Sequence, residues 1–220
     1  MLVKASTRLN RISKLSTQKQ YQHIYDLCCD HGLLGLLLHE AHPQAHIHFI
    51  DIKKHIINEL EQKLDKSKFD FNFTLKARDI CGLDIFDHSL VCLAGVGANL
   101  IIKFLEKSMN LNQQFDLIIC CNQHIHKLRK FLFDHQFKVY CEEVLLCQNQ
   151  FYEIISLGPH ADKEISLISS GISLCNNQHL EYVSQQQNYF ATKAHHTDDQ
   201  TVHSLLERYT SLKRKFICTE

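Results

Sequence analysis

The residue types best suited to chemistry lie in a short acidic segment, Asp26-Leu27-Cys28-Cys29-Asp30-His31-Gly32. It follows an apolar run that is typical of a strand, and Gly35 comes three residues after Gly32. Glycines at such a turn let the backbone approach a ligand closely. The spacing is not G-x-G-x-x-G, and an acidic turn suits a cofactor with a cationic amino-acid tail better than a pyrophosphate. S-adenosylmethionine fits, because its sulfonium and α-amino groups are positive.

Two further acids follow later apolar runs. Asp51 closes the second run, 25 residues after Asp26, so it is placed to accept both hydroxyls of a ribose. Asp79 follows the third run and is a candidate for the adenine amino group. Strand-end caps and turn formers are the alternative interpretation of these acids. Three acids at three successive strand exits favour ligand binding, and the predicted cofactor site adds His31 and Gly32 to them.

Two more segments follow later strands. Ala94-Gly95-Val96-Gly97-Ala98-Asn99 holds two of the seven glycines, and we expect Gly95 and Gly97 to expose backbone beside the reacting methyl group. A tight turn between strand and helix is the alternative. Asn122-Gln123-His124 follows the fifth run, with Arg129 shortly beyond it. Side-chain amides there can read the edge of a base, although Asn122 is equally suited to begin a helix as its N-cap.

The elements that must position these residues alternate along the chain. We expect strands at 23–27, 46–52, 71–77, 90–95 and 115–121, and helices at about 34–41, 55–64, 99–108 and 127–135. This alternation predicts a parallel sheet with helices on both faces, whose carboxyl edge binds a nucleotide-like ligand. Residues 137–147 and 151–158 then indicate a β-hairpin. The predicted fold class is α/β: a doubly wound, Rossmann-like sheet of the methyltransferase type, with seven strands and a terminal antiparallel hairpin.

The ends of the chain are expected to be helical. Residues 177–194 and 201–216 predict a small antiparallel helical hairpin, with Asp198 or Asp199 as the N-cap of its second helix. Leu9, Ile12 and Leu15 define one face of an N-terminal helix. We therefore expect a cofactor-binding domain over residues 1–158, including that helix, and a helical domain over residues 159–220.

The net charge of zero gives no indication that the protein binds nucleic acid or an anionic membrane. The 220 residues contain 24 Lys+Arg and 24 Asp+Glu, and no apolar run is long enough to span a membrane. The basic N-terminus has no continuous apolar core, so we expect no secretory signal and a cytoplasmic protein. Basic residues nevertheless gather at both ends: Lys4, Arg8, Arg11, Lys14 and Lys19, then Arg208, Lys213, Arg214 and Lys215.

Ten Cys and sixteen His are the most conspicuous entries of the composition. A reducing compartment makes disulfides improbable. No C-x-x-C occurs, and the adjacent pairs Cys28-Cys29 and Cys120-Cys121 have neither zinc nor redox spacing. The H-x-H pairs at 46–48 and 124–126 lack a third ligand at a recognisable spacing. Metal binding therefore stays a minority interpretation, and no metal is expected.

Taken in order, these motifs resemble a known family. The chain is similar to the bacterial tRNA (adenine-22-N1)-methyltransferases, the TrmK family of class I S-adenosylmethionine-dependent methyltransferases. The resemblance covers roughly residues 5–158 and, more loosely, the C-terminal helices. It rests on these residues: Arg8-Leu9 with Ile12; Asp26, Asp30 and His31; Asp51; Arg78-Asp79; Ala94-Gly95-Val96-Gly97; Asn122; Leu128-Arg129; Glu142, Glu143 and Tyr152-Glu153-Ile154-Ile155.

The resemblance implies methyl transfer from the sulfonium to N1 of an adenine in tRNA, with the base unpaired or extruded. N1 has a free lone pair, so the implied catalysis is positioning and stabilisation of the cation formed on the base. Asp30 is the candidate for that stabilisation, and Asn122 for orienting the base. Arg8, Arg11, Arg129, Lys213 and Arg214 are the implied contacts to tRNA, although a solvated surface also explains the basic ends.

The chain departs from the family pattern at the first loop, where Cys28 and Cys29 replace a glycine and a small hydroxyl residue, and at Ala98, where the family has glycine. A proline before Asn122 is also missing. Alternative functions are therefore methylation of another RNA or a small molecule, or RNA binding without catalysis on a decayed methyltransferase fold. A nicotinamide dehydrogenase ranks last, because the phosphate-binding glycine spacing is absent. A monomer is favoured.

Overall fold

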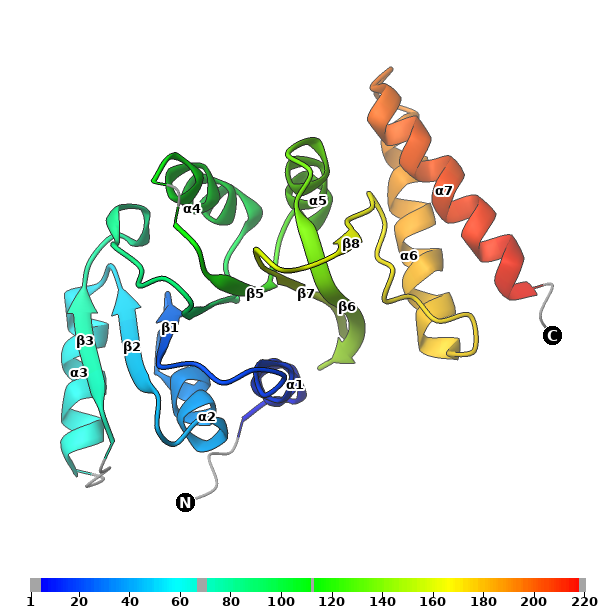
Figure 1. Cartoon of the computed structure of the whole chain (residues 1–220). Coiled ribbons are helices and arrows are strands. Elements are labelled where there is room, and N and C mark those ends of the chain that lie inside the picture. The colour runs from blue at the N-terminus through cyan, green and yellow to red at the C-terminus, as the bar shows by residue number, and fades with distance from the viewer. Residues whose placement is uncertain (1–4, 67–70, 112, 218–220) are drawn as a thin grey trace.

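The computed structural model describes residues 5–66, 71–111 and 113–217; Lys4 of the predicted basic N-terminus lies outside them. Its strands form one sheet in the order β3-β2-β1-β4-β5-β7-β6-β8 (Figure 1). The strands are β1 (His23–Leu27), β2 (His46–Asp51), β3 (Phe73–Ala77), β4 (Leu90–Ala94), β5 (Asp116–Cys120), β6 (Lys138–Cys147), β7 (Gln150–Leu157) and β8 (Lys163–Glu164). The helices are α1 (Thr7–Ser16), α2 (Leu33–Ala41), α3 (Lys54–Lys66), α4 (Ala98–Asn110), α5 (Ile125–Asp134), α6 (Asn177–Ala194) and α7 (Gln200–Ile217), with a short 3₁₀ turn η1 (Ile80–Gly82).

The predicted fold class is confirmed. Strands β1 to β5 pair in parallel, and β7 enters antiparallel beside β5. The expected elements begin and end within about two residues of the observed ones. One element is additional: β8 pairs through Lys163 and Glu164 with the start of β6 and makes the sheet eight-stranded rather than seven-stranded. This strand has only two residues, and both are polar, so the sequence shows no alternating pattern that would predict it.

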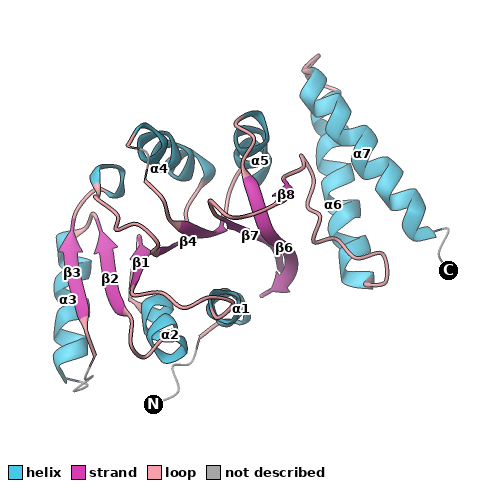
Figure 2. Cartoon of the chain, in the orientation of Figure 1, coloured by secondary structure: helices cyan, strands magenta, loops and turns pink. Residues whose placement is uncertain are grey.

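Two apolar cores cover the two faces of the sheet, and Figure 2 shows the helical layers on either side. On one face, α1, α2 and α3 pack against residues such as Phe49 and Ile118. On the other, α4 and α5 pack against residues such as Leu93 and Ile119. Central strands β4 and β5 are almost continuously apolar because both of their faces are buried. Because helices cover both faces of the sheet, the ends of the parallel strands and the loops after them come together at its carboxyl edge.

The hairpin between β6 and β7 turns on two residues. Gln148 and Asn149 both have positive φ, 52° and 60°. Two consecutive left-handed residues are the geometry of the two-residue turn whose twist matches that of the flanking strands. Gln150, expected in the link, is instead the first residue of β7.

The C-terminal helices form the predicted antiparallel pair. Asp199 begins α7, because its Oδ1 accepts the backbone N–H of Thr201 at 2.8 Å. The pair packs against the outer part of the β6–β7 hairpin, where Val144 and Phe151 join the apolar side chains of α6 and α7. In Figure 1 these helices stand beside the β6 end of the sheet.

Candidate active site

A cavity of about 450 Å³ lies at the carboxyl edge of the sheet, where β1, β2 and β4 end. Three of the predicted acids line it together: Asp26, Asp30 and Asp51. The rest of its lining comes from the same strand exits and from the start of α1: Arg8, Leu9, Cys28, Cys29, His31, Leu33, Leu34, Ile52, Lys53, Ile56, Ala94, Gly95 and Val96. The topology thus brings together residues that are far apart in the sequence, as the predicted parallel sheet requires.

Asp26 is the buried base of the site, with 2% of its surface exposed. Its Oδ2 accepts the backbone N–H of Gly35 at 2.8 Å. Helix α2 begins after Gly32, which has no side chain to cap it, so Asp26 satisfies one of the free N–H groups of the first turn from the neighbouring strand. Burial raises the pKa of Asp26 to about 8, and the nearby Asp51 carboxylate acts in the same direction. A cationic ligand would favour the ionised form.

Asp51 is held rigidly at the end of β2. Its Oδ1 accepts the backbone N–H of Lys53 at 2.9 Å, and its Oδ2 faces the N–H of Asp30 at 3.4 Å. The carboxylate therefore ties the exits of β1 and β2 together while it lines the cavity. The position fits the predicted contact with a pair of ribose hydroxyls.

The loop after β1 is bent by three left-handed residues: Cys28, Asp30 and Gly32, with φ of 58°, 48° and 70°. This bend leaves the side chains of Asp30 and His31 exposed at the cavity, with Asp30 Oδ2 3.8 Å from His31 Nε2. Burial raises the pKa of the Cys28 thiol to about 12, and nearby carboxylates add to that effect. Cys28 is therefore a neutral wall residue rather than a nucleophile.

The exits of β4 and β5 run side by side. The backbone N–H of Asn122 donates to the carbonyl of Val96 at 3.0 Å, and its Nδ2 donates to the carbonyl of Gly95 at 2.8 Å. Gly97 pairs in a single parallel bridge with Gln123. Asn122 is not a helix cap, because His124 occupies that position before α5. Its exposed side chain lies beside Gly95 of the cavity, so the structure brings it to the same edge.

Other predicted site residues lie elsewhere. Asp79 caps η1 by accepting the N–H of Cys81 at 2.9 Å, which lowers its pKa, and does not line the cavity. Arg11 pairs with Glu143 on β6. Lys213 donates to Gln187 of the neighbouring helix at 3.0 Å, and Arg214 is exposed on α7. Gly97 starts α4 outside the cavity.

Arg129 requires a correction. The sequence placed it among the tRNA contacts, but it is fully buried and pairs with Glu142 and Glu153. A fully buried guanidinium that is paired with two carboxylates has no surface left for a phosphate. Tyr182 of α6 donates to the same Glu153 at 2.5 Å, so this network joins α5, the β6–β7 hairpin and the C-terminal helices.

The apolar part of the cavity lining was not predicted as part of the site. Ile52 follows Asp51 and is 67% exposed, and the partly exposed Leu9 and Val96, known from the sequence only as motif residues, line the same cavity. Such an apolar rim suits the flat face of a base. The sequence signal for it was limited to an Ile that directly follows the strand-end acid Asp51.

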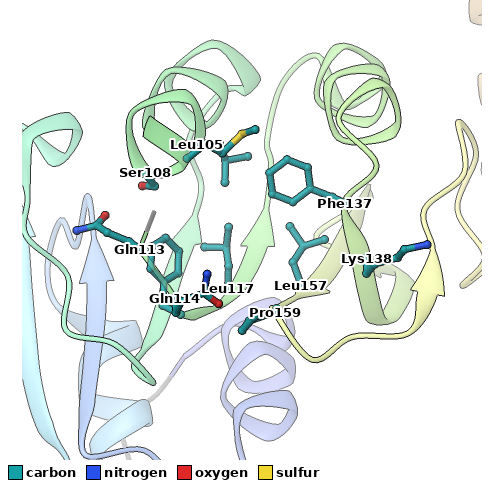
Figure 3. A pocket seen from close by; sticks show the side chains of 12 residues that line it. Leu105, Ser108, Gln113, Gln114, Leu117, Phe137, Lys138, Leu157 and Pro159 are labelled. Atoms are coloured by element: carbon teal, nitrogen blue, oxygen red, sulfur yellow. The ribbon is translucent and has the colours of Figure 1, made fainter. Parts of the chain in front are cut away.

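A second cavity, of about 200 Å³, lies at the opposite edge of the sheet (Figure 3). Leu117 at the start of β5, Leu157 at the end of β7, and Phe137 point into it, and Gln113 and Gln114 stand at its side. It contains no acid and is remote from the strand exits, so it does not compete as the cofactor site. In residues 5–66, 71–111 and 113–217, no group of three His, Cys, Asp or Glu is arranged to hold a metal ion. No helix within those ranges has the length and apolarity needed to cross a membrane.

Comparisons with known proteins agree with this geometry. The model of the methyltransferase domain family matches residues 5–155, which include every strand exit of the cavity. No curated protein matches the sequence.

Solved structures of low sequence identity share the fold over nearly the whole chain. The B. subtilis tRNA methyltransferase TrmK superposes with a TM-score of 0.71 at 17% identity, covering 98% of both chains. The M. capricolum TrmK, solved with S-adenosyl-homocysteine, gives 0.65 at 18% identity and covers 98% of this chain and 97% of its own. The S. pneumoniae protein Sp1610, solved with S-adenosyl-L-methionine, gives 0.70 at 17% identity, with 94% and 99% covered.

Proposed function

The chain belongs to the methyltransferase domain family, and from that premise we propose that it transfers the methyl group of S-adenosylmethionine to N1 of an adenine in tRNA. One observation carries the proposal: Asp26, Asp30 and Asp51 converge on a single cavity at the carboxyl edge. The tRNA substrate is taken from the TrmK structures that share the fold. A cytoplasmic location is part of the same proposal, because tRNA is the proposed substrate.

The residues present fit the cofactor. Asp51, fixed by two backbone N–H groups, accepts the ribose hydroxyls. Asp26 and Asp30 supply negative charge where the sulfonium and amino groups require it, and the apolar rim at Ile52 covers the adenine face. When bound, the cofactor supplies an activated methyl group.

The chain's own part in the reaction is positioning and charge. Adenine N1 attacks with its own lone pair, so no residue has to remove a proton before transfer. Asp30 stabilises the cation that forms on the base, because its carboxylate is exposed at the cavity. Asn122 donates its side-chain Nδ2–H to the carbonyl of Gly95, and its Oδ1 accepts from the exocyclic amino group of the base.

Access of the base requires that the adenine leave its pair, because N1 lies on the Watson–Crick edge. We assign residues 1–158 to cofactor binding and chemistry, and residues 159–220 to holding the RNA. Arg214 on α7 and Lys14 on α1 are exposed cations available to phosphates, whereas Lys213 and Arg11 are already engaged within the protein.

Calorimetry and a transfer assay test the proposal. S-adenosylmethionine is titrated into the wild-type protein, Asp51→Ala and the control Asp65→Ala, which removes an exposed acid of α3. We expect binding by the wild type and the control, and at least tenfold weaker binding by Asp51→Ala. Transfer of tritiated methyl to unmodified tRNA, followed by nucleoside mass spectrometry, should give 1-methyladenosine.

The alternatives give different results in the same assays. Methylation of small molecules but never of RNA would replace tRNA as the substrate. RNA binding without any cofactor binding would indicate a decayed fold. One observation favours the decayed fold: Cys28 lines the cavity at a position where the family has glycine.

A further inference from the structure

Arg8, at the start of α1, lies inside the acid cavity rather than on an outer surface. Resting on the proposed function, we infer that Arg8 binds the carboxylate of the cofactor's amino-acid tail, and that Tyr152 on β7 holds its guanidinium in place. This inference replaces the sequence-based expectation that Arg8 contacts tRNA phosphates.

Three neighbours define where the guanidinium lies. Its central carbon is 4.7 Å from the centre of the Tyr152 ring. Its two terminal nitrogens lie 3.7 and 3.8 Å from where a Cβ of Gly95 would be. It is also near the Cys120 thiol, whose pKa burial raises to about 12 and Arg8 acts to lower. The positive charge therefore sits at the exits of β4 and β5.

Arg8 differs from Arg11 and Arg129 because it has no carboxylate partner among the described residues. Arg11, one turn along the same helix, pairs with Glu143, and the buried Arg129 pairs with two glutamates. Among residues 5–66, 71–111 and 113–217, no carboxylate lies within ion-pair distance of Arg8. A half-buried arginine that faces a cavity without a carboxylate partner is well suited to bind an anionic group of the ligand.

The ligand supplies such a group. An α-amino-acid tail carries one positive amino group and one negative carboxylate, and three acids in the cavity accept only the positive part. A cation elsewhere in the lining is required to offset repulsion between those acids and the carboxylate. Lys53 is at the far end, beside Asp51, and its side chain is exposed. Arg8 is the cation at the β4 end, and its planar fork matches a carboxylate in two hydrogen bonds.

Tyr152 acts as a positioning residue. Its ring is half-buried against the α1 face of the sheet, and its hydroxyl donates to Gln150 at 3.1 Å. The aromatic face attracts the guanidinium and limits its rotamers before the ligand arrives. Preorganisation of this kind lowers the cost of binding.

A comparison of two ligands and two proteins tests the inference. Calorimetry measures the affinities of S-adenosylmethionine and of decarboxylated S-adenosylmethionine for the wild type and for Arg8→Met, which keeps an apolar stem against Tyr152. We expect the wild type to favour the carboxylate ligand by about 10- to 100-fold. Arg8→Met should lose that preference and bind both ligands like the wild type binds the decarboxylated one.

Further variants separate a specific role from a general one. Lys66→Ala removes an exposed cation from α3, to which no role in binding is assigned, and should keep the full preference. Arg8→Lys should keep part of it, because the charge remains but the fork is lost. Tyr152→Leu should reduce the preference about 2- to 10-fold, and Tyr152→Phe should restore it, because the ring alone attracts the cation.

The failures are distinguishable. A wild type that binds neither ligand overturns the proposed function. A wild type that binds both equally overturns the inference on Arg8 without any variant. An Arg8→Met protein that retains the preference but binds tRNA more weakly would overturn the inference and support the earlier expectation that Arg8 contacts tRNA.

Discussion

Gly35 in the first turn of α2 permits contact between that helix and Phe49 of β2, and Gly35→Ala tests this steric role. A Cβ at Gly35 would lie 2.1 Å from Cε1 of Phe49 and 2.8 Å from its Cδ1 and Cζ. Carbon atoms in contact are normally about 3.5–4.0 Å apart, so the ring or the helix must shift by more than about 1 Å. Phe49 is fully buried within the core beneath α2 and has no open side to move into.

Two effects of opposite sign compete in this variant. Alanine in a helix is favoured over glycine by about 0.5–1 kcal/mol. Overpacking of a filled core costs about 1–3 kcal/mol. The overlap is with a rigid ring rather than the end of a flexible chain, so we expect the upper part of that range and a net loss of about 1–2 kcal/mol.

Urea denaturation of Gly35→Ala measures the free energy of unfolding. Gly82→Ala is the matched control, because its new Cβ meets only the end of Arg78 at 3.9 Å, and its stability should change by less than about 1 kcal/mol. Phe49→Leu removes the edge of the ring and should recover at least about 1 kcal/mol when combined with Gly35→Ala. If Gly35→Ala is as stable as the wild type or more stable, helix propensity dominates and the steric argument fails.

Three other predictions follow from buried charges. Arg129→Met should destabilise the protein by about 3–5 kcal/mol in urea, because two carboxylates are left unpaired, whereas the exposed Lys130→Ala should cost less than about 1 kcal/mol. Burial lowers the pKa of His48 to about 3, so its contribution to stability is complete above pH 6.5 and is lost as the pH falls towards 3. Unfolding at pH 7 and pH 5 should differ by up to about 2 kcal/mol from this group, and His48→Phe should remove that part. Because Asp26 has a pKa of about 8, S-adenosylmethionine should bind more tightly as the pH rises from about 6 to about 7.5, a range in which the α-amino group of the ligand is still largely protonated, and calorimetry of Asp26→Asn should show a flatter dependence.

The fold was predictable because its signals are local. Buried parallel strands are short apolar runs, and the helices between them repeat their apolar residues at helical spacing. The strand β8 was not predictable, because two polar residues pair with β6 only after the chain has turned back along it. The left-handed Gln148 and Asn149 similarly made the hairpin turn one residue shorter than expected.

Site residues were predictable where the end of a strand determines their position. They were not predictable where their position depends on a contact with a side chain far away in the sequence. Asp26 and Asp51 follow from the topology of parallel strands. Asp79 also follows a strand, but the short 3₁₀ turn at 80–82 uses its carboxylate as a cap. Arg129 is buried only because glutamates from two later strands lie beneath α5. Arg8 depends in the same way on Tyr152, which is 144 residues away.

The loop after β1 bears on whether the site is functional or decayed. It holds Cys28 and Asp30 in the left-handed region, and each non-glycine residue there costs about 1–2 kcal/mol. Such strain persists only where surrounding contacts determine the conformation. Here those contacts are the N–H of Asp30 on Asp51 and the N–H of Gly35 on Asp26, which are also the acids of the cavity. The same bonds that hold this loop therefore also aim the carboxylates, and Asp26, Asp30 and Asp51 still line one cavity with cysteine at position 28.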